Sequence, residues 1–159
     1  MLGQEGVRYI LRYADDRYGL IYLLERSSYY TTHPVIFLAC HGKRGSLDIG
    51  QDTVRLVDLA DDLPEGLLSG KTVYLGSCAT AADAAAMQTL RERSGAEVIC
   101  GYADPKGVDN LEASAFELLL MRELTTSKRG TTALRRLKDR PASKSLWKAM
   151  NFVTVPARI

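Results

Sequence analysis

Three short apolar runs are the feature that most constrains how this chain can fold. They are VIFLA at residues 35–39, TVYLGSC at residues 72–78 and AEVICGY at residues 96–102. Continuous apolar runs of this length are typical of strands that are buried on both faces of a parallel sheet. Longer segments with helical periodicity separate the runs, and strands that alternate with helices form parallel sheets. The sequence therefore predicts an α/β sandwich of three layers, with a mainly parallel sheet between helices.

Other segments fill in this outline. Apolar residues recur at helical spacing in residues 15–26, 79–93 and 111–124, and in a basic region, residues 121–159, where Pro141 separates amphipathic stretches. Alternation of apolar and polar residues predicts a strand at residues 7–13. A Gly-Gln-Asp turn between Ile49 and Val54 predicts a small hairpin after His41. Residues 151–156 are expected to add a last edge strand.

Composition indicates one domain, residues 1–159. The chain is 46% hydrophobic and 25% charged, which suits a compact domain with a sizeable core. No apolar run approaches the roughly 20 residues that cross a bilayer, and the N-terminus lacks a signal-peptide pattern, so we expect a cytoplasmic protein with no membrane contact. Three cysteines, an odd number, favour reduced thiols.

Charge is unevenly distributed. Residues 1–120 hold 11 Lys and Arg against 17 Asp and Glu, whereas residues 121–159 hold 10 against 2. The basic residues fall where amphipathic helices would face solvent, and one aromatic residue, Trp147, lies among them. This pattern favours a solvated or partner-binding face over a nucleic-acid surface.

Two reactive side chains follow two of the apolar runs. His41 comes after VIFLA, and Cys78 comes at the end of the next run. Functional groups gather beyond the carboxyl ends of strands in open α/β sheets, so we expect the two side chains at one sheet edge. An imidazole and a helix N-terminus near Thr80 would both favour a thiolate at Cys78. Gly42 would let a substrate carbonyl approach the backbone, and its N–H and that of Cys78 could form an oxyanion hole.

The blocks ACHG and LGSCAT, at residues 39–42 and 75–80, resemble the His-Gly and Ser-Cys blocks of caspase-like cysteine peptidases, especially the bacterial CHAT-type branch. The resemblance extends, in order and spacing, from Val7 to Leu124. It implies a caspase-like sandwich and an endopeptidase with Cys78 as nucleophile, His41 as base and acid, and Gly42 and Cys78 as oxyanion donors. It also implies a protein or peptide substrate and control by a regulatory partner or signal in bacterial antiviral defence or programmed death. No cofactor and no metal is expected.

Substrate preference depends on Asp104 and Asp109, which lie in the loop after VICGY. An anionic pocket at these residues would favour cleavage after Lys or Arg. The alternative for Asp109 is a cap on the following helix, since Glu112 stands three residues later in a capping-box pattern.

Three other interpretations are open. The chain could be a caspase-like interaction module without catalysis, or a flavodoxin-like domain that binds a nucleotide or flavin. A zinc site at Cys40, His41, Cys78 and Cys100 is disfavoured because no C-x-x-C spacing occurs. Cys40 should face the core if His41 faces a cleft, because neighbouring strand residues point to opposite faces. Cys100 is expected to be a buried strand residue, and His33 a surface loop residue.

Overall fold

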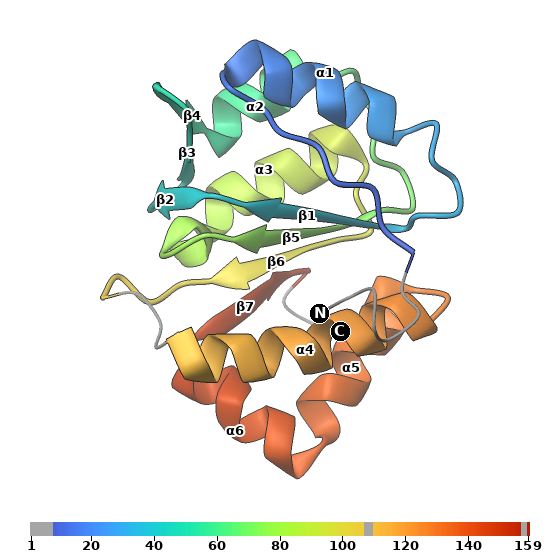
Figure 1. Cartoon of the computed structure of the whole chain (residues 1–159), viewed down its shortest axis with the longest axis vertical. Helices are drawn as coiled ribbons and strands as arrows, with labels where there is room; N and C mark the ends of the chain where they lie inside the picture. The colour runs from blue at the N-terminus through green and yellow to red at the C-terminus, as the bar shows by residue number, and fades with distance from the viewer. Residues whose placement is uncertain (1–7, 107–109, 157–158) are drawn as a thin grey trace.

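The computed structural model describes residues 8–106, 110–156 and 159. Its main sheet has four strands in the order β1 (Val35–Ala39), β5 (Thr72–Gly76), β6 (Val98–Tyr102) and β7 (Phe152–Val155). β1, β5 and β6 are parallel, and β7 is antiparallel to β6. The three apolar runs thus form the parallel strands that the sequence predicts, and residues 152–155 form the predicted edge strand (Figure 1).

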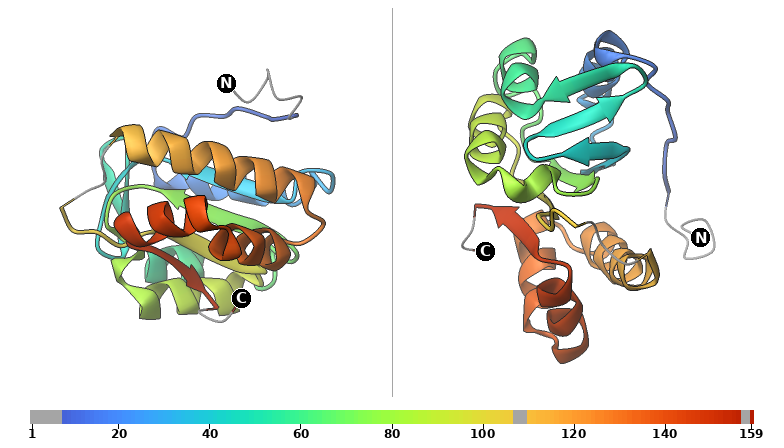
Figure 2. Two further views of the ribbon diagram at one scale, coloured as in Figure 1. Left: turned by 90° about the horizontal axis from the view of Figure 1, so that it is seen from below. Right: turned by 90° about the vertical axis from the view of Figure 1, so that its left-hand side faces the viewer.

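Helices lie on both sides of this sheet (Figures 1 and 2). On one side are α1 (Arg17–Ser27), α2 (Leu56–Asp62) and α3 (Ala84–Ser94). On the other are α4 (Asn110–Thr126), α5 (Gly130–Asp139) and α6 (Pro141–Ala149). The basic region after residue 120 thus contains two separate helices besides the end of α4. Proline begins α6, because its fixed φ suits the first position of a helix and its missing N–H is not needed there.

Alternation along the strands divides the core in two. On β5, Val73 and Leu75 pack with α2 and α3, whereas Tyr74 packs with α4 and α5. On β6, Ile99 belongs to the first cluster and Cys100 to the second. All five side chains are buried, and full burial of an aliphatic side chain contributes about 1.5–3 kcal/mol. Burial on both faces explains why these strands have no polar alternation.

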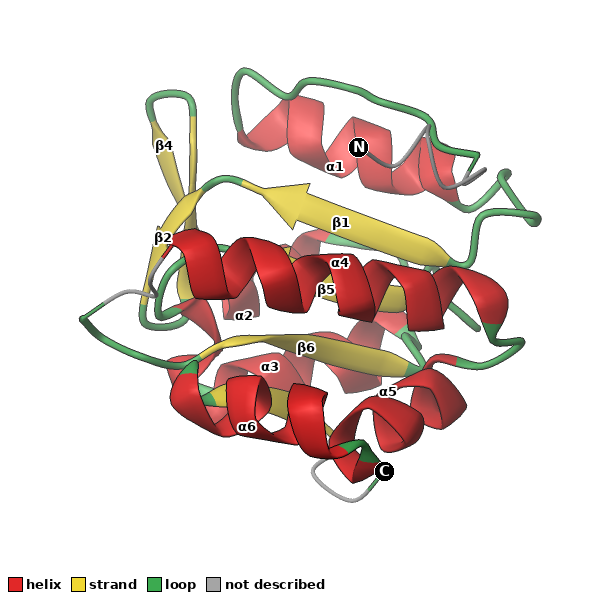
Figure 3. Ribbon diagram, turned by 60° about the horizontal axis from the view of Figure 1, so that its bottom comes forward, coloured by secondary structure: helices red, strands yellow, loops and turns green. Residues whose placement is uncertain are grey.

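A second, three-stranded antiparallel sheet stands beyond the carboxyl ends of β1 and β5 (Figures 2 and 3). It consists of β2 (His41–Lys43), β3 (Ser46–Ile49) and β4 (Asp52–Arg55), in that order. The predicted hairpin is formed by β3 and β4. β2, which begins at His41 itself, was not expected from the sequence. Leu56 is the first residue of α2, directly after β4.

The N-terminal segment departs from the prediction. Residues 8–13 form no strand, although their pattern predicted one. Tyr9 and Leu11 are each 59% exposed and Tyr13 is 80% exposed, so the apolar residues of this segment do not enter either core cluster. An alternating pattern alone does not make a strand, because the backbone also needs a hydrogen-bonding partner. In the part of the chain that the structure describes, no helix is long and apolar enough to cross a membrane.

Candidate active site

The paired ends of β1 and β5 lead to His41 and Cys78. Ala39, the last residue of β1, pairs with Gly76, the last residue of β5. His41 and Cys78 each stand two residues after this pair, beyond the last paired residues of the two strands. Both residues are exposed. No hydrogen bond joins the two side chains among the residues that the structure describes. The paired strands thus end two residues before each member of the predicted pair, and a contact between the two side chains stays a prediction.

Gly42 lies directly against the turn that carries Cys78. A Cβ added to Gly42 would overlap the Thr80 hydroxyl oxygen, and would lie 2.8 Å from the Ser46 carbonyl oxygen and 3.0 Å from Ser77 Cβ. Any side chain at this position would push the β2–β3 hairpin away from the Cys78 turn. The sequence indicated a glycine for substrate access, and the structure adds that the glycine permits this close packing.

Hydrogen bonds hold the Cys78 turn to the hairpin. The Ser77 hydroxyl donates to Thr80 Oγ1 over 2.7 Å, and the Thr80 hydroxyl donates to the Ser46 carbonyl over 2.8 Å. The backbone N–H of Gly45 donates to the Thr80 carbonyl over 3.1 Å. Ser77 and Thr80 are buried while Cys78 between them is exposed. Ser77 and Thr80 were not among the predicted site residues. The two hydroxyl residues that flank the cysteine in SCAT are nevertheless a local signal of a fixed turn.

Backbone conformation also shapes this turn. Ala79 has a φ of 57°, in the left-handed region that residues with a Cβ rarely adopt. A single turn of 3-10 helix, η2 (Thr80–Ala82), follows. Strained residues of this kind persist only where the surrounding structure fixes them, and they cluster at functional sites. Here the hydrogen bonds through Ser77 and Thr80 supply that support.

The helix after Cys78 begins later than the sequence predicted. We expected it at residues 79–93 with its N-terminus near Thr80, but α3 starts at Ala84. The Asp83 side chain caps it by accepting a hydrogen bond from the Ala86 N–H over 3.0 Å. Aspartate is a preferred N-cap residue, so it sets the helix start in place of the alanines before it. The α3 N-terminus is thus already capped by a carboxylate five residues beyond Cys78.

Two backbone N–H groups, those of Gly42 and Cys78, form no hydrogen bond with the described residues. Lys43 and Ser46 flank a two-residue turn, so they exchange both ladder hydrogen bonds, and the next pair, Gly42 and Leu47, exchanges none. The Gly42 N–H therefore has no partner in β3. Among the described residues, the Cys78 N–H also makes no hydrogen bond. Two unpaired backbone donors on adjacent segments can bind the negative oxygen of an acyl-transfer intermediate.

A cavity of about 350 Å³ opens beside Cys78. Small and apolar residues make up most of its lining, and the charged residues in it are two cations, Lys43 and Arg44. Neither cation forms an ion pair with a described residue. The described residues that line it are Gly42, Lys43, Arg44, Cys78, Ala79, Ala82 and Pro105.

Asp104, one of the two acidic residues proposed for substrate binding, is not among the described residues that line this cavity. Asp104 is half-buried, and its Oδ1 accepts a hydrogen bond from the Lys106 N–H over 2.8 Å, so it fixes the turn around Pro105. Asp109 lies outside the described residues, and its alternative role as a helix cap lies outside them too. The preference for substrates with Lys or Arg stays a prediction.

The other two cysteines are packed in the core, as the sequence predicts. Cys40 packs against the cluster formed with α2 and α3. Burial, together with the nearby Asp48 carboxylate, raises the pKa of the Cys40 thiol to about 11. Cys100 is fully buried, which raises the pKa of its thiol far above its usual value. Cys78 is thus the exposed thiol of the three.

The remaining predictions concern His33 and metal ions. His33 lies in the loop before β1, half-buried, with its Nδ1 3.1 Å from the Thr32 hydroxyl. Among the described residues, no group of three or more His, Cys, Asp or Glu side chains is placed to hold a metal ion. The zinc site considered from the sequence has no such group to form it.

Comparisons with known proteins add no identity to this geometry. The chain matches no model of a known protein family, and a search of curated proteins finds no relative either.

Proposed function

We propose that this protein is a cysteine endopeptidase that hydrolyses peptide bonds with a Cys78–His41 dyad. One observation carries the proposal: His41 and Cys78 each stand two residues along the chain after a paired strand end, and Gly42 packs against the cysteine turn. A nucleophile, a base and two free backbone donors at one sheet edge are the parts that acyl transfer needs.

The chemistry follows from these parts. His41 accepts the thiol proton of Cys78, and the thiolate sulfur attacks the substrate carbonyl carbon. The carbonyl oxygen takes the negative charge and accepts hydrogen bonds from the Gly42 and Cys78 N–H groups. His41 then gives its proton to the leaving amine as the peptide C–N bond breaks. Water, deprotonated by His41, attacks the thioester, and the protonated sulfur leaves, which restores the enzyme and releases the acid.

The proposal extends to class and setting. The His-Gly and Ser-Cys blocks support a place among caspase-like peptidases of the CHAT type. On that basis we propose a cytoplasmic enzyme whose activity depends on a regulatory partner or signal, in bacterial defence or programmed death. The two side chains are exposed and, among the described residues, no hydrogen bond joins them. This supports such control, because exposed side chains need ordering before they can exchange a proton.

Specificity is where sequence and geometry point to different substrates. The predicted preference for Lys or Arg rests on Asp104 and Asp109. The charges that line the cavity beside Cys78 are positive, and they favour substrates with an acidic side chain near the scissile bond. A peptide library cleaved by the protein, with the fragments identified by mass spectrometry, separates the two: fragment ends rich in Lys or Arg support the acidic loop, and ends rich in Asp or Glu support the cationic cavity.

A thiol-reactive peptidyl probe tests the enzyme itself. We expect covalent labelling at Cys78, loss of labelling in Cys78→Ala, and at least about a hundredfold loss of labelling rate in His41→Ala, the lower end of what general acid–base catalysis contributes. Cys40→Ala is the matched control, because it removes a neighbouring thiol and should leave labelling intact. Equal labelling of His41→Ala and the unchanged protein would contradict the dyad.

The second candidate is an interaction module with a caspase-like fold and no catalysis. The observation that favours it is the absence, among the described residues, of a hydrogen bond between His41 and Cys78. It predicts that Cys78 reacts with simple alkylating agents but not selectively with peptidyl probes, and that the library stays uncut with every activator added.

A further inference from the structure

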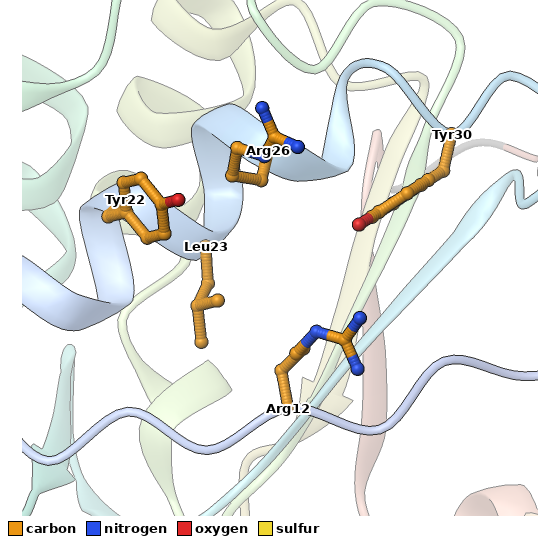
Figure 4. Close-up of a pocket in the computed structure, with 5 residues that line it drawn as sticks. All are labelled: Arg12, Tyr22, Leu23, Arg26 and Tyr30. Carbon is orange, nitrogen blue, oxygen red and sulfur yellow. The ribbon is translucent and has the colours of Figure 1, made fainter.

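A second cavity, of about 230 Å³, lies between the N-terminal segment and α1. It belongs to elements that take no part in the candidate active site. Its lining comes from the N-terminal segment, from one face of α1, and from the loop that leads to β1: Arg12, Tyr22, Leu23, Arg26 and Tyr30. Figure 4 shows the Tyr30 hydroxyl and the Arg12 guanidinium turned toward the space between the helix and the N-terminal segment.

Two arginines in this lining, Arg12 and Arg26, form no ion pair with a carboxylate of the described residues. Arg12 donates one hydrogen bond, to the Leu11 carbonyl over 2.8 Å, and the Arg26 guanidinium lies 5.4 Å from the centre of the Tyr29 ring. Among the described residues, neither forms an ion pair. Four arginines elsewhere do pair with a carboxylate: Arg17, Arg55, Arg93 and Arg140. Most N–H donors of Arg12 and Arg26 are therefore free for a ligand.

The other side chains define what else a ligand would meet. Tyr22 and Tyr30 offer hydroxyl donors and ring faces, and Leu23 offers an apolar contact. None of the described residues in the lining is acidic. A volume of about 230 Å³ lies below the range of about 300–1,000 Å³ typical of sites for drug-sized ligands, so the ligand must be small.

We propose that this cavity binds the phosphate group of a small phosphomonoester. Two guanidinium groups supply two positive charges, which match the charge of about −1.5 to −2 on a phosphomonoester at neutral pH. A carboxylate would leave one of these charges uncompensated. The planar guanidinium fork also suits paired hydrogen bonds to phosphate oxygens. Because Arg12 comes from the N-terminal segment and Arg26 from α1, the bound phosphate joins two elements that the sheet does not hold together.

Calorimetric titration of the full chain tests this site with two probes, inorganic phosphate and a nucleoside monophosphate. The unphosphorylated nucleoside is the third arm. We expect saturable binding of both phosphate probes and none of the nucleoside. Tighter binding of the nucleoside monophosphate than of phosphate would show that the tyrosine rings contact a base, and equal binding would show that the phosphate alone is recognised.

Variants locate the binding. Arg12→Gln and Arg26→Gln should each raise the Kd at least about tenfold, because each removes a charge-assisted contact. Both side chains are exposed, so the fold should survive, which circular dichroism checks. Arg135→Gln is the matched control: Arg135 is an exposed arginine of α5, without an ion pair to a described residue, on the other side of the sheet. An unchanged Kd in both pocket variants, or no saturable binding of either phosphate probe, would overturn the proposal.

Discussion

Gly42 packs against Thr80 so closely that a methyl group on Gly42 would overlap the Thr80 hydroxyl oxygen. This contact joins the strand that begins at His41 to the turn that carries Cys78. Thr80 is fully buried, and its hydroxyl is held between Ser77 and the Ser46 carbonyl, so it cannot move aside without breaking hydrogen bonds. The relative position of the proposed base and nucleophile therefore depends on a glycine and a threonine that do no chemistry themselves.

Substitution Gly42→Ala tests this contact. We expect the free energy of unfolding to fall by about 1–3 kcal/mol through overpacking. We expect probe labelling of Cys78 to slow by about a hundredfold, since a shift of about 1 Å in a catalytic group has that effect. Chemical denaturation and labelling rates measure the two effects.

Gly70→Ala is the control for a lost glycine. A Cβ at Gly70 meets no atom within 4 Å, although its φ of +74° makes the backbone unfavourable for alanine. It should cost about 1 kcal/mol of stability and leave the labelling rate intact. Similar labelling in the two variants would show that the Gly42 contact does not position the dyad.

Thr80→Ala removes the hydroxyl that links Ser77 to the Ser46 carbonyl. Two buried polar groups would lose their partner, and each such loss costs about 1–3 kcal/mol. Thr80→Ser keeps the hydroxyl and should recover most of the stability. Urea unfolding midpoints compare the variants, and a serine variant as unstable as the alanine variant would assign the effect to the lost methyl group instead.

Alkylation should separate the three cysteines by burial. At neutral pH, iodoacetamide should modify the exposed Cys78 first, as peptide mapping by mass spectrometry would show. Cys40 should react slowly until the pH approaches its pKa of about 11, and the fully buried Cys100 should react only when the chain unfolds. Fast modification of Cys40 at neutral pH would contradict its place in the core.

The same raised pKa predicts a loss of stability in alkali. The Cys40 thiol ionises near 9.0 in the unfolded chain and near 11 in the folded protein. Between these values the unfolded chain binds fewer protons, so the free energy of unfolding falls as pH rises through this window. Unfolding midpoints of Cys40→Ala, measured across the window, should fall less steeply than those of the unchanged protein.

Two buried tyrosines, Tyr74 and Tyr102, form hydrogen bonds with Glu117 of α4. The Tyr74 hydroxyl donates to Glu117 Oε1 over 2.6 Å and lies 2.8 Å from the Tyr102 hydroxyl, which is 3.3 Å from the same carboxylate oxygen. Tyr74→Phe should lower the free energy of unfolding by about 1–3 kcal/mol, because Glu117 loses its shorter hydrogen bond. Tyr102→Phe should cost less. Urea unfolding measures both, and equal costs would show that the two hydroxyls contribute alike.

Local sequence pattern accounted for most of the elements of the fold. The three strands that begin at Val35, Thr72 and Val98 are the predicted parallel strands. Burial on both faces explains the apolar residues of β5 and β6, whereas β1 is an edge strand whose residues are half-buried or exposed. Pro141 marked a helix start through its fixed φ. Alternation of neighbouring residues placed Cys40 toward the core, where it is partly buried, and the apolar run at residues 96–102 placed Cys100 there, where it is fully buried.

Pattern failed where a tertiary partner decides the outcome. Residues 8–13 alternate as a strand would, yet they form none. The helix after Cys78 begins at Ala84 because the Asp83 cap, the left-handed Ala79 and the Thr80 hydrogen bonds outweigh the helix propensity of the alanines. The sequence could not show β2, whose partner in β3 follows across a two-residue turn with few apolar residues.

For the candidate site, the sequence by itself determined which residues have the chemistry that the proposed reaction needs, His41, Cys78 and Gly42, and that they lie at or just beyond the ends of two apolar runs. Only the tertiary structure decided that β1 and β5 are neighbours in a register that pairs Ala39 with Gly76, and that Lys43 and Arg44 are among the described residues that line the cavity beside Cys78. The physical reason is that side-chain chemistry and periodicity are local properties, whereas register and lining depend on contacts between residues far apart in the chain.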